Sequence, residues 1–143
     1  MAEICLKIVI GMTLLSCGVQ DIIKKKVYLW LLAAGGLVSL LCIPFCSDIS
    51  LYSRLAGVIV GVGVILLSFI TGGKIGLGDG VLLCITGLAL GFWGNMELFG
   101  LALMLAAVLS IILLAFRKVD RKKSIPFIPF MFAGYLILVL SKT

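Results

Sequence analysis

The segment LYSRLAGVIVGVGVILLSFITGGKIGLGDG, residues 51–80, carries the two features that decide the fold. Residues 51–70 are apolar apart from a few polar side chains, and a run of about 20 apolar residues is long enough to cross a bilayer as a helix. Residues 73–80, GKIGLGDG, follow as a glycine-rich bend with one lysine and one aspartate. The segment therefore predicts a membrane helix that ends in a bend bearing a carboxylate.

The whole chain repeats this alternation of apolar runs and short polar breaks. Of its 143 residues, 63% are hydrophobic and only 13% are charged, and the mean hydropathy is +1.34. A soluble domain carries about 25% charged residues. We expect one all-α domain, a polytopic membrane protein with six transmembrane helices at about Ile4–Val19, Val27–Phe45, Leu51–Ile70, Leu77–Gly94, Leu98–Phe116 and Ile125–Leu140.

Two pairs of glycines, spaced four residues apart, lie inside the expected spans. They are Gly57 with Gly61 and Gly87 with Gly91. Small residues at this spacing let two membrane helices approach closely. The pairs therefore predict tight helix packing.

The positions of the basic residues predict the orientation of the chain. Nine of the twelve lysines and arginines follow the first, third and fifth expected spans: Lys24, Lys25, Lys26, Lys74, Arg117, Lys118, Arg121, Lys122 and Lys123. The positive-inside rule places this side in the cytoplasm and both termini outside it. We therefore expect a multi-pass protein of the cytoplasmic membrane. The net charge of +6 lies in short loops, which indicates contact with membrane lipids and no nucleic-acid partner.

Two aspartates are expected at the cytoplasmic ends of helices, slightly inside the apolar layer. Asp21 lies fourteen residues after Lys7, which is about 21 Å of helix against a hydrocarbon core of about 30 Å. Asp79 begins a span that is similarly short. An ionisable side chain at such a depth is a functional-site hypothesis by default.

Each aspartate also has a purely structural interpretation. Asp79 could cap the helix that follows it, and Asp21 could pair with Lys24 or Lys25, three and four residues further along the same helix face. However, a simple cap does not require the glycines that surround Asp79. Gly76, Gly78 and Gly80 would let another chain come close to its carboxylate.

Three short motifs resemble one family of membrane enzymes. GLGD at Gly76–Asp79 resembles the GxGD motif of intramembrane aspartic proteases, and IPFIPF at 125–130 is similar to the Ile-Pro-Phe-Gly-Pro-Phe segment of type IV prepilin peptidases. In that family the first catalytic aspartate ends a helix before a short basic loop, as Asp21 does before IIKKKVYLW. The resemblance covers essentially the whole chain.

The resemblance implies a hydrolase, an aspartic endopeptidase that removes a leader peptide without a cofactor or a metal. Asp21 and Asp79 would be the catalytic pair, and the active site would be shaped by Gly76, Gly78, Gly80, Pro126 and Pro129. The substrates would be prepilins or pseudopilins with a basic leader and an apolar N-terminal helix. The chain has no histidine, which excludes a histidine-based triad.

The chain departs from the family pattern at several positions. Val81 replaces a frequent lysine, Ile128 replaces the glycine between the two prolines, and Val27–Tyr28 stand where Ile-Pro is common. No CxxC motif is present, so the chain resembles the short, peptidase-only branch, and methylation of the product is not expected.

Two other functional classes remain open from the sequence. A small transporter or channel subunit could use Asp21 and Asp79 as a proton or cation site, although no inverted repeat is visible. A structural membrane subunit of a secretion machine is the third interpretation. If the pair is catalytic, the helix ends alone favour Asp79 as the ionised base and Asp21 as the acid, whereas Lys24 and Lys25 favour the ionised form of Asp21.

Overall fold

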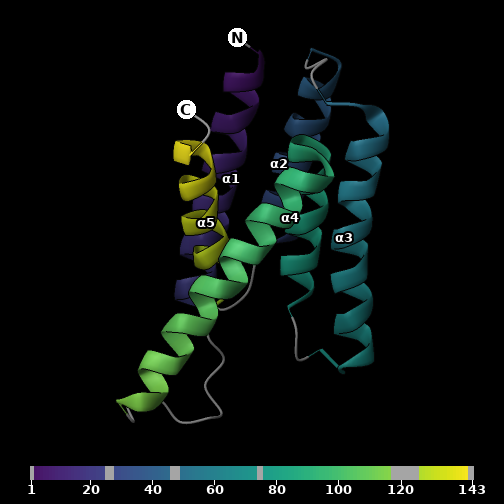
Figure 1. Cartoon of the computed structure of the whole chain (residues 1–143). Coiled ribbons are helices and arrows are strands. Elements are labelled where there is room, and N and C mark those ends of the chain that lie inside the picture. The colour runs from purple at the N-terminus through teal and green to yellow at the C-terminus, as the bar shows by residue number, and fades with distance from the viewer. Residues whose placement is uncertain (1, 25–27, 46–48, 74–75, 117–125, 142–143) are drawn as a thin grey trace.

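The protein is helical throughout the part of the chain that can be described. The computed structural model describes residues 2–24, 28–45, 49–73, 76–116 and 126–141, and over these residues it contains five α-helices, one short 3-10 helix and no strand (Figure 1). The elements are α1 (Ala2–Lys24), α2 (Leu29–Cys42), the 3-10 helix η1 (Ile43–Phe45), α3 (Leu51–Ile70), α4 (Leu77–Ala115) and α5 (Ile128–Ser141). The expectation of an all-α protein is confirmed.

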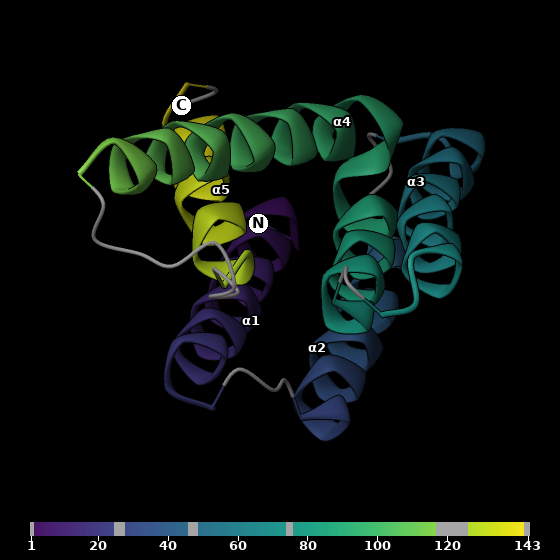
Figure 2. The ribbon, with the colours of Figure 1, turned by 90° about the horizontal axis from the view of Figure 1, so that it is seen from below.

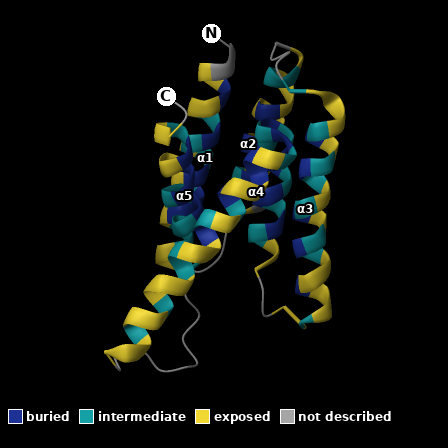
Figure 3. Cartoon of the chain, viewed as in Figure 1, coloured by how far each residue is buried: buried dark blue, intermediate teal, exposed yellow. Residues whose placement is uncertain are grey.

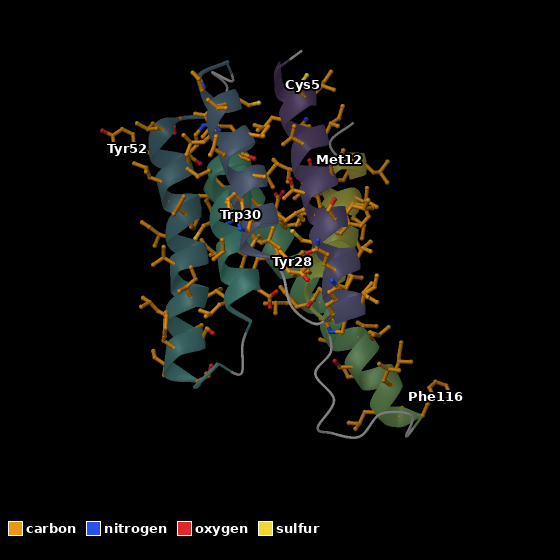
Figure 4. All side chains as sticks on the ribbon, turned by 180° about the vertical axis from the view of Figure 1, so that it is seen from behind. Cys5, Met12, Tyr28, Trp30, Tyr52 and Phe116 are labelled. Carbon is orange, nitrogen blue, oxygen red and sulfur yellow. The ribbon has the colours of Figure 1, made fainter. Side chains whose placement is uncertain are left out.

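Three of these helices are long and apolar enough to cross a membrane. They are Ile4–Lys24 of α1, Leu51–Ile70 and Leu77–Ala115, and two shorter apolar helices cover Trp30–Cys42 and Ile128–Ser141. Many large apolar side chains along the helices point outward and are exposed, so much of the outer surface is apolar (Figures 3 and 4). Such a continuous apolar exterior indicates a membrane protein, because water would not solvate it.

The largest difference from the expected boundaries lies in α4. The sequence predicted a break at Asn95–Glu97, but these residues are helical, and the only non-helical backbone inside α4 is at Gly91, with φ 72° and ψ −176°. There the chain turns back on itself (Figure 1). We call residues 77–90 and 92–115 the first and second arms of α4.

Glycine is required at this turn for two reasons. A φ of 72° lies in the left-handed region that other L-residues adopt at a cost, and a β-carbon at Gly91 would lie 2.8 Å from the Ser53 hydroxyl oxygen. That hydroxyl accepts a hydrogen bond of 3.1 Å from the N–H of Phe92. The first turn of α3 therefore supports the point at which α4 reverses.

A cluster of buried polar groups joins α3 to both arms of α4 near this turn. The amide nitrogen of Asn95 donates to the carbonyls of Gly57 and Leu83, each at 3.0 Å, and its oxygen accepts from the Thr86 hydroxyl at 2.7 Å. Arg54 is only 2% exposed and donates from Nη1 to the Leu88 carbonyl at 2.8 Å. We call Arg54, Thr86 and Asn95 the polar cluster.

The expected glycine pairs do pack α3 against the first arm of α4. A β-carbon at Gly57 would lie 2.6 Å from the Gly87 carbonyl oxygen, and one at Gly61 would lie 2.8 Å from the Gly80 carbonyl oxygen. The prediction of close packing is confirmed for these contacts. Gly91 differs from the other glycines because it forms the reversal itself.

Helix α5 packs against α1 and the second arm of α4. The Tyr135 hydroxyl donates to the Lys7 carbonyl at 2.7 Å, and a β-carbon at Gly134 would lie 3.3 Å from the backbone nitrogen of Ala102. The side chains of Leu14, Leu98 and Met131 are completely buried in the core. Figure 2 shows α5 between α1 and the second arm when the molecule is seen from below.

Successive helical segments run in alternating directions if the two arms of α4 are followed separately (Figure 1). Both ends of the chain therefore lie at the same end of the molecule, together with the reversal at Gly91. The end of α1 and the starts of α4 and α5 lie toward the opposite end (Figures 1 and 2).

Candidate functional site

Asp21 lies in the last turn of α1 and contacts the beginning of α5. It is half-buried, one turn beyond the buried side chain of Cys17, with which it interacts electrostatically. The backbone N–H of Ile128 donates to Asp21 Oδ2 at 3.4 Å, although the two residues are 107 positions apart in the sequence. The structure thus brings Asp21 to the IPFIPF segment.

Helices α1 and α5 pack against each other at Gly18. A β-carbon at this position would lie 3.5 Å from Cα and 3.6 Å from the nitrogen of Pro129. Pro129 itself lies in the first turn of α5, where the missing N–H of proline costs little. Pro126 is half-buried and precedes the helix. Both prolines named from the sequence therefore lie at the start of α5, and Pro129 is packed on α1.

Asp79 is the third residue of α4. The N-cap is Gly76, whose carbonyl accepts the Asp79 N–H at 3.1 Å, so the interpretation of Asp79 as the N-cap residue is wrong. The carboxylate folds back over Gly76, where an added β-carbon would lie 3.0 Å from Asp79 Oδ2. Among the described residues, no hydrogen bond to this carboxylate is found.

The carboxylates of Asp21 and Asp79 lie close enough to interact electrostatically. They come from the end of α1 and the start of α4, and Ile128 adds the start of α5. Figure 2 shows the start of α5 beside α1, with the first arm of α4 on the other side, next to α2 and α3. Two carboxylates that interact electrostatically titrate as a coupled pair, so ionisation of one disfavours ionisation of the other.

The glycines around Asp79 have different environments. Gly76 lies beneath the carboxylate, as described above. Gly80 faces α3 instead, because a β-carbon there would lie 2.5 Å from Ile65 Cγ1 and 3.3 Å from the Gly61 carbonyl oxygen. Gly78 is half-buried between them. Gly76 therefore contacts the Asp79 carboxylate, as expected, whereas Gly80 packs α4 onto α3.

The structure describes only one of the two lysines that the sequence offered as partners of Asp21. Lys24 donates from Nζ to the Tyr28 hydroxyl at 2.9 Å and lies 5.0 Å from the centre of the Tyr28 ring. Lys25 lies outside the described residues. Most of the basic residues that were used to predict orientation also lie outside them, including Lys74 and those at 117–123.

The sequence did not point to two groups at the contact between α1 and α5. The Ile128 donor is a backbone N–H, which no side-chain pattern can mark. Gly18 lies three residues before Asp21, and its proximity was the only available signal. Within the described ranges, no three histidine, cysteine, aspartate or glutamate side chains come together in a group that could hold a metal ion.

Comparison of the chain with models of known protein families, with curated proteins and with solved structures gave no match. The carboxylate pair and the motifs around it are therefore the features that point to a function.

Proposed function

We propose that this protein is a membrane aspartic endopeptidase that cleaves the basic leader from type IV prepilin-like proteins at the cytoplasmic face of the membrane. The observation that carries the proposal is the approach of Asp21 to Asp79, with the start of α5 bonded to Asp21. The motifs that resemble prepilin peptidases, GLGD and IPFIPF, contribute residues to this same meeting point.

The carboxylate pair would hydrolyse a peptide bond without a covalent intermediate. The ionised carboxylate takes a proton from a water molecule, whose oxygen attacks the carbonyl carbon of the scissile bond. The protonated carboxylic acid donates to the carbonyl oxygen, and the C–N bond breaks as the amine accepts a proton. The products are the leader, with a new carboxyl terminus, and the mature protein, with a new amino terminus.

The substrate would be a prepilin or pseudopilin whose apolar N-terminal helix lies in the bilayer beside the enzyme. Its basic leader would remain in the cytoplasm, because lysine and arginine are retained on that side. An extended segment between the two parts would meet the carboxylates. The carboxylate of Asp79 supports this arrangement, because it is only half-buried and has no hydrogen-bond partner among the described residues.

We propose six membrane crossings, with both termini outside the cytoplasm and the two arms of α4 as separate crossings. Three features support this topology: the alternating directions of the segments, the two chain ends at one end of the molecule, and the basic residues expected at the other. Helices α2 and α5 have 14 residues each, about 21 Å of rise, so the residues beside them must complete those crossings.

A cleavage assay tests the proposal directly. The purified protein in detergent micelles should release the leader from a prepilin of the same cell, and Asp21→Asn and Asp79→Asn should each lower the rate at least about 1,000-fold. Each variant should keep the helical circular dichroism spectrum of the parent protein. Glu97→Gln, at an exposed position on α4, is the matched control and should cleave normally.

Cleavage at the parent rate by either aspartate variant would rule out the aspartyl mechanism. A transporter or channel subunit would instead show proton or cation flux in liposomes that both aspartate variants abolish, with no cleavage of the prepilin.

A further inference from the structure

We infer that the Asp21 carboxylate, from α1, caps the first N–H of α5, and that this Ile128 N–H makes Asp21 the ionised member of the carboxylate pair. The shared proton then resides on Asp79. The capping contact is independent of the proposed function, whereas the roles of base for Asp21 and acid for Asp79 rest on it.

The first turn of α5 has one backbone donor directed at Asp21. Pro129 has no N–H, and the N–H groups of Phe130 and Met131 bond to the Phe127 carbonyl at 3.0 and 3.2 Å. The N–H of Ile128 donates to Asp21 Oδ2 at 3.4 Å. A carboxylate that accepts a backbone N–H at a helix N-terminus is favoured in its ionised form by the bond and by the helix dipole.

Contacts other than this hydrogen bond also hold α5 in place. Pro129 packs over Gly18, and Tyr135 bonds to the Lys7 carbonyl toward the other end of α1. The ring of Phe127 meets the ring of Phe99 on α4 edge-on, with centroids 6.3 Å apart. The Ile128 N–H is therefore aimed at Asp21 by the packing of the helix, and removing the bond should leave α5 where it is.

The charged groups around the pair support the same assignment. Asp21 faces Asp79 from α4, and its own helix contributes Cys17 and Lys24, of which Lys24 donates to Tyr28. Asp79 accepts no hydrogen bond from the described residues and lies against Gly76. Two carboxylates in one site cannot both ionise easily, so the one with a donor keeps its charge and the other keeps the proton.

The dipole of each aspartate's own helix favoured an ionised Asp79 and a protonated Asp21, and the contact with α5 reverses these two states. Asp21 ends α1, which disfavours its anion, but it also caps the start of α5, which favours it. The hydrogen bond and the dipole of α5 both favour the Asp21 anion and oppose the dipole of α1. Ile128 is accordingly a positioning residue that acts through its backbone.

An amide-to-ester substitution at residue 128 tests the inference, because it replaces the N–H by oxygen and keeps the isoleucine side chain. We expect the pH at which Asp21 protonates to rise by about one unit. The lost hydrogen bond stabilises the charged carboxylate by a free energy that corresponds to a shift of about this size. The measurement is an infrared titration of the purified protein with isotope-labelled aspartate carboxyls. The carboxyl band that is absent from the spectrum of the Asp21→Asn variant is the band of Asp21.

An ester at residue 131 is the matched control. It removes the Met131 N–H that bonds to the Phe127 carbonyl, so it weakens the same turn of α5 without touching Asp21. We expect no change in the titration of Asp21. Equal shifts from both esters, or no shift from the ester at 128, would overturn the inference.

A second pair of variants covers the case in which the ester protein does not fold. Ile128→Pro also removes the N–H and suits a helix start, while Ile128→Val keeps it. Only the proline variant should shift the titration upward. If the titration shifts as expected but no prepilin is cleaved, the cap stands and the proposed function fails. If the acidic pH at which cleavage is lost does not shift together with the titration of Asp21, then Asp21 is not the catalytic base.

Discussion

The two ends of the molecule use polar side chains inside an apolar protein in opposite ways. Near the reversal at Gly91, Asn95 and Thr86 are fully buried and Arg54 nearly so, and Asn95 alone takes part in three hydrogen bonds. At the other end Asp21 and Asp79 are half-buried and repel each other electrostatically, and Asp21 accepts a hydrogen bond from the Ile128 N–H of α5.

The difference separates a polar group that stabilises from one that can react. A buried network with every group bonded is rigid and specifies one arrangement of helices. Two acids that repel each other cost stability, so such a pair is a candidate for chemistry. The comparison predicts that substitutions at the first end change stability, and that substitutions at the second change activity.

Gly91→Ala should have the largest effect on stability. The substitution places a side chain at φ 72° and a β-carbon 2.8 Å from the Ser53 hydroxyl and 2.9 Å from Ile49 Cγ2. We expect a loss of about 3 kcal/mol in the free energy of unfolding, from backbone strain and from displacement of α3. Thermal unfolding in detergent measures it. Gly100→Ala, where an added β-carbon would have nothing within 4 Å, should be neutral, and equal effects at both sites would contradict the prediction.

Asn95→Leu should have a smaller effect of the same kind. The leucine leaves the Gly57 and Leu83 carbonyls without the amide donor and removes the shortest of the hydrogen bonds of the Thr86 hydroxyl, which keeps its bonds to carbonyls of its own helix. Buried groups that lose their partners cost about 2 kcal/mol here. Thermal unfolding of Asn95→Leu beside Met96→Leu, an exposed neighbour, checks this. A stabilised Asn95→Leu protein would show that the polar cluster does not stabilise the fold.

Gly76→Ala should have the smallest effect on stability and a clear one on activity. The added β-carbon would lie 3.0 Å from Asp79 Oδ2 and would push the carboxylate away from its position. We expect about a tenfold lower cleavage rate, or about 1.4 kcal/mol in the activation barrier, with unfolding nearly unchanged. Gly63→Ala, with open space around the added carbon, is the control. A loss of stability without a loss of rate would remove the distinction between the two ends.

The sequence predicted the helices well because their signals are local. Residues 51–70 form one helix with the expected bounds, since an uninterrupted apolar run needs no partner to be recognised. The reversal of α4 was misplaced because Asn95 was interpreted as a loop residue. It is buried against α3 instead, and a single sequence cannot show that a polar side chain will find partners on another helix.

The candidate site was predicted in part. Asp21, Asp79 and Pro129 stood out by residue type, position and motif, and the structure brings their segments together. Gly80 stood out for the same reasons, yet it faces Ile65 on α3. Glycine carries no side chain that marks a direction, so only the neighbouring helix decides whether it borders the carboxylate or the packing contact.

The sequence by itself determined that this protein is a set of apolar helices with two acids at helix ends, because length, hydropathy and turn residues act within each segment. Only the tertiary structure decided which acid receives a hydrogen bond. The donor is the backbone N–H at the start of α5, and its position beside Asp21 follows from the packing of Pro129 over Gly18. Packing between distant segments therefore distinguishes two carboxylates that look equivalent along the chain.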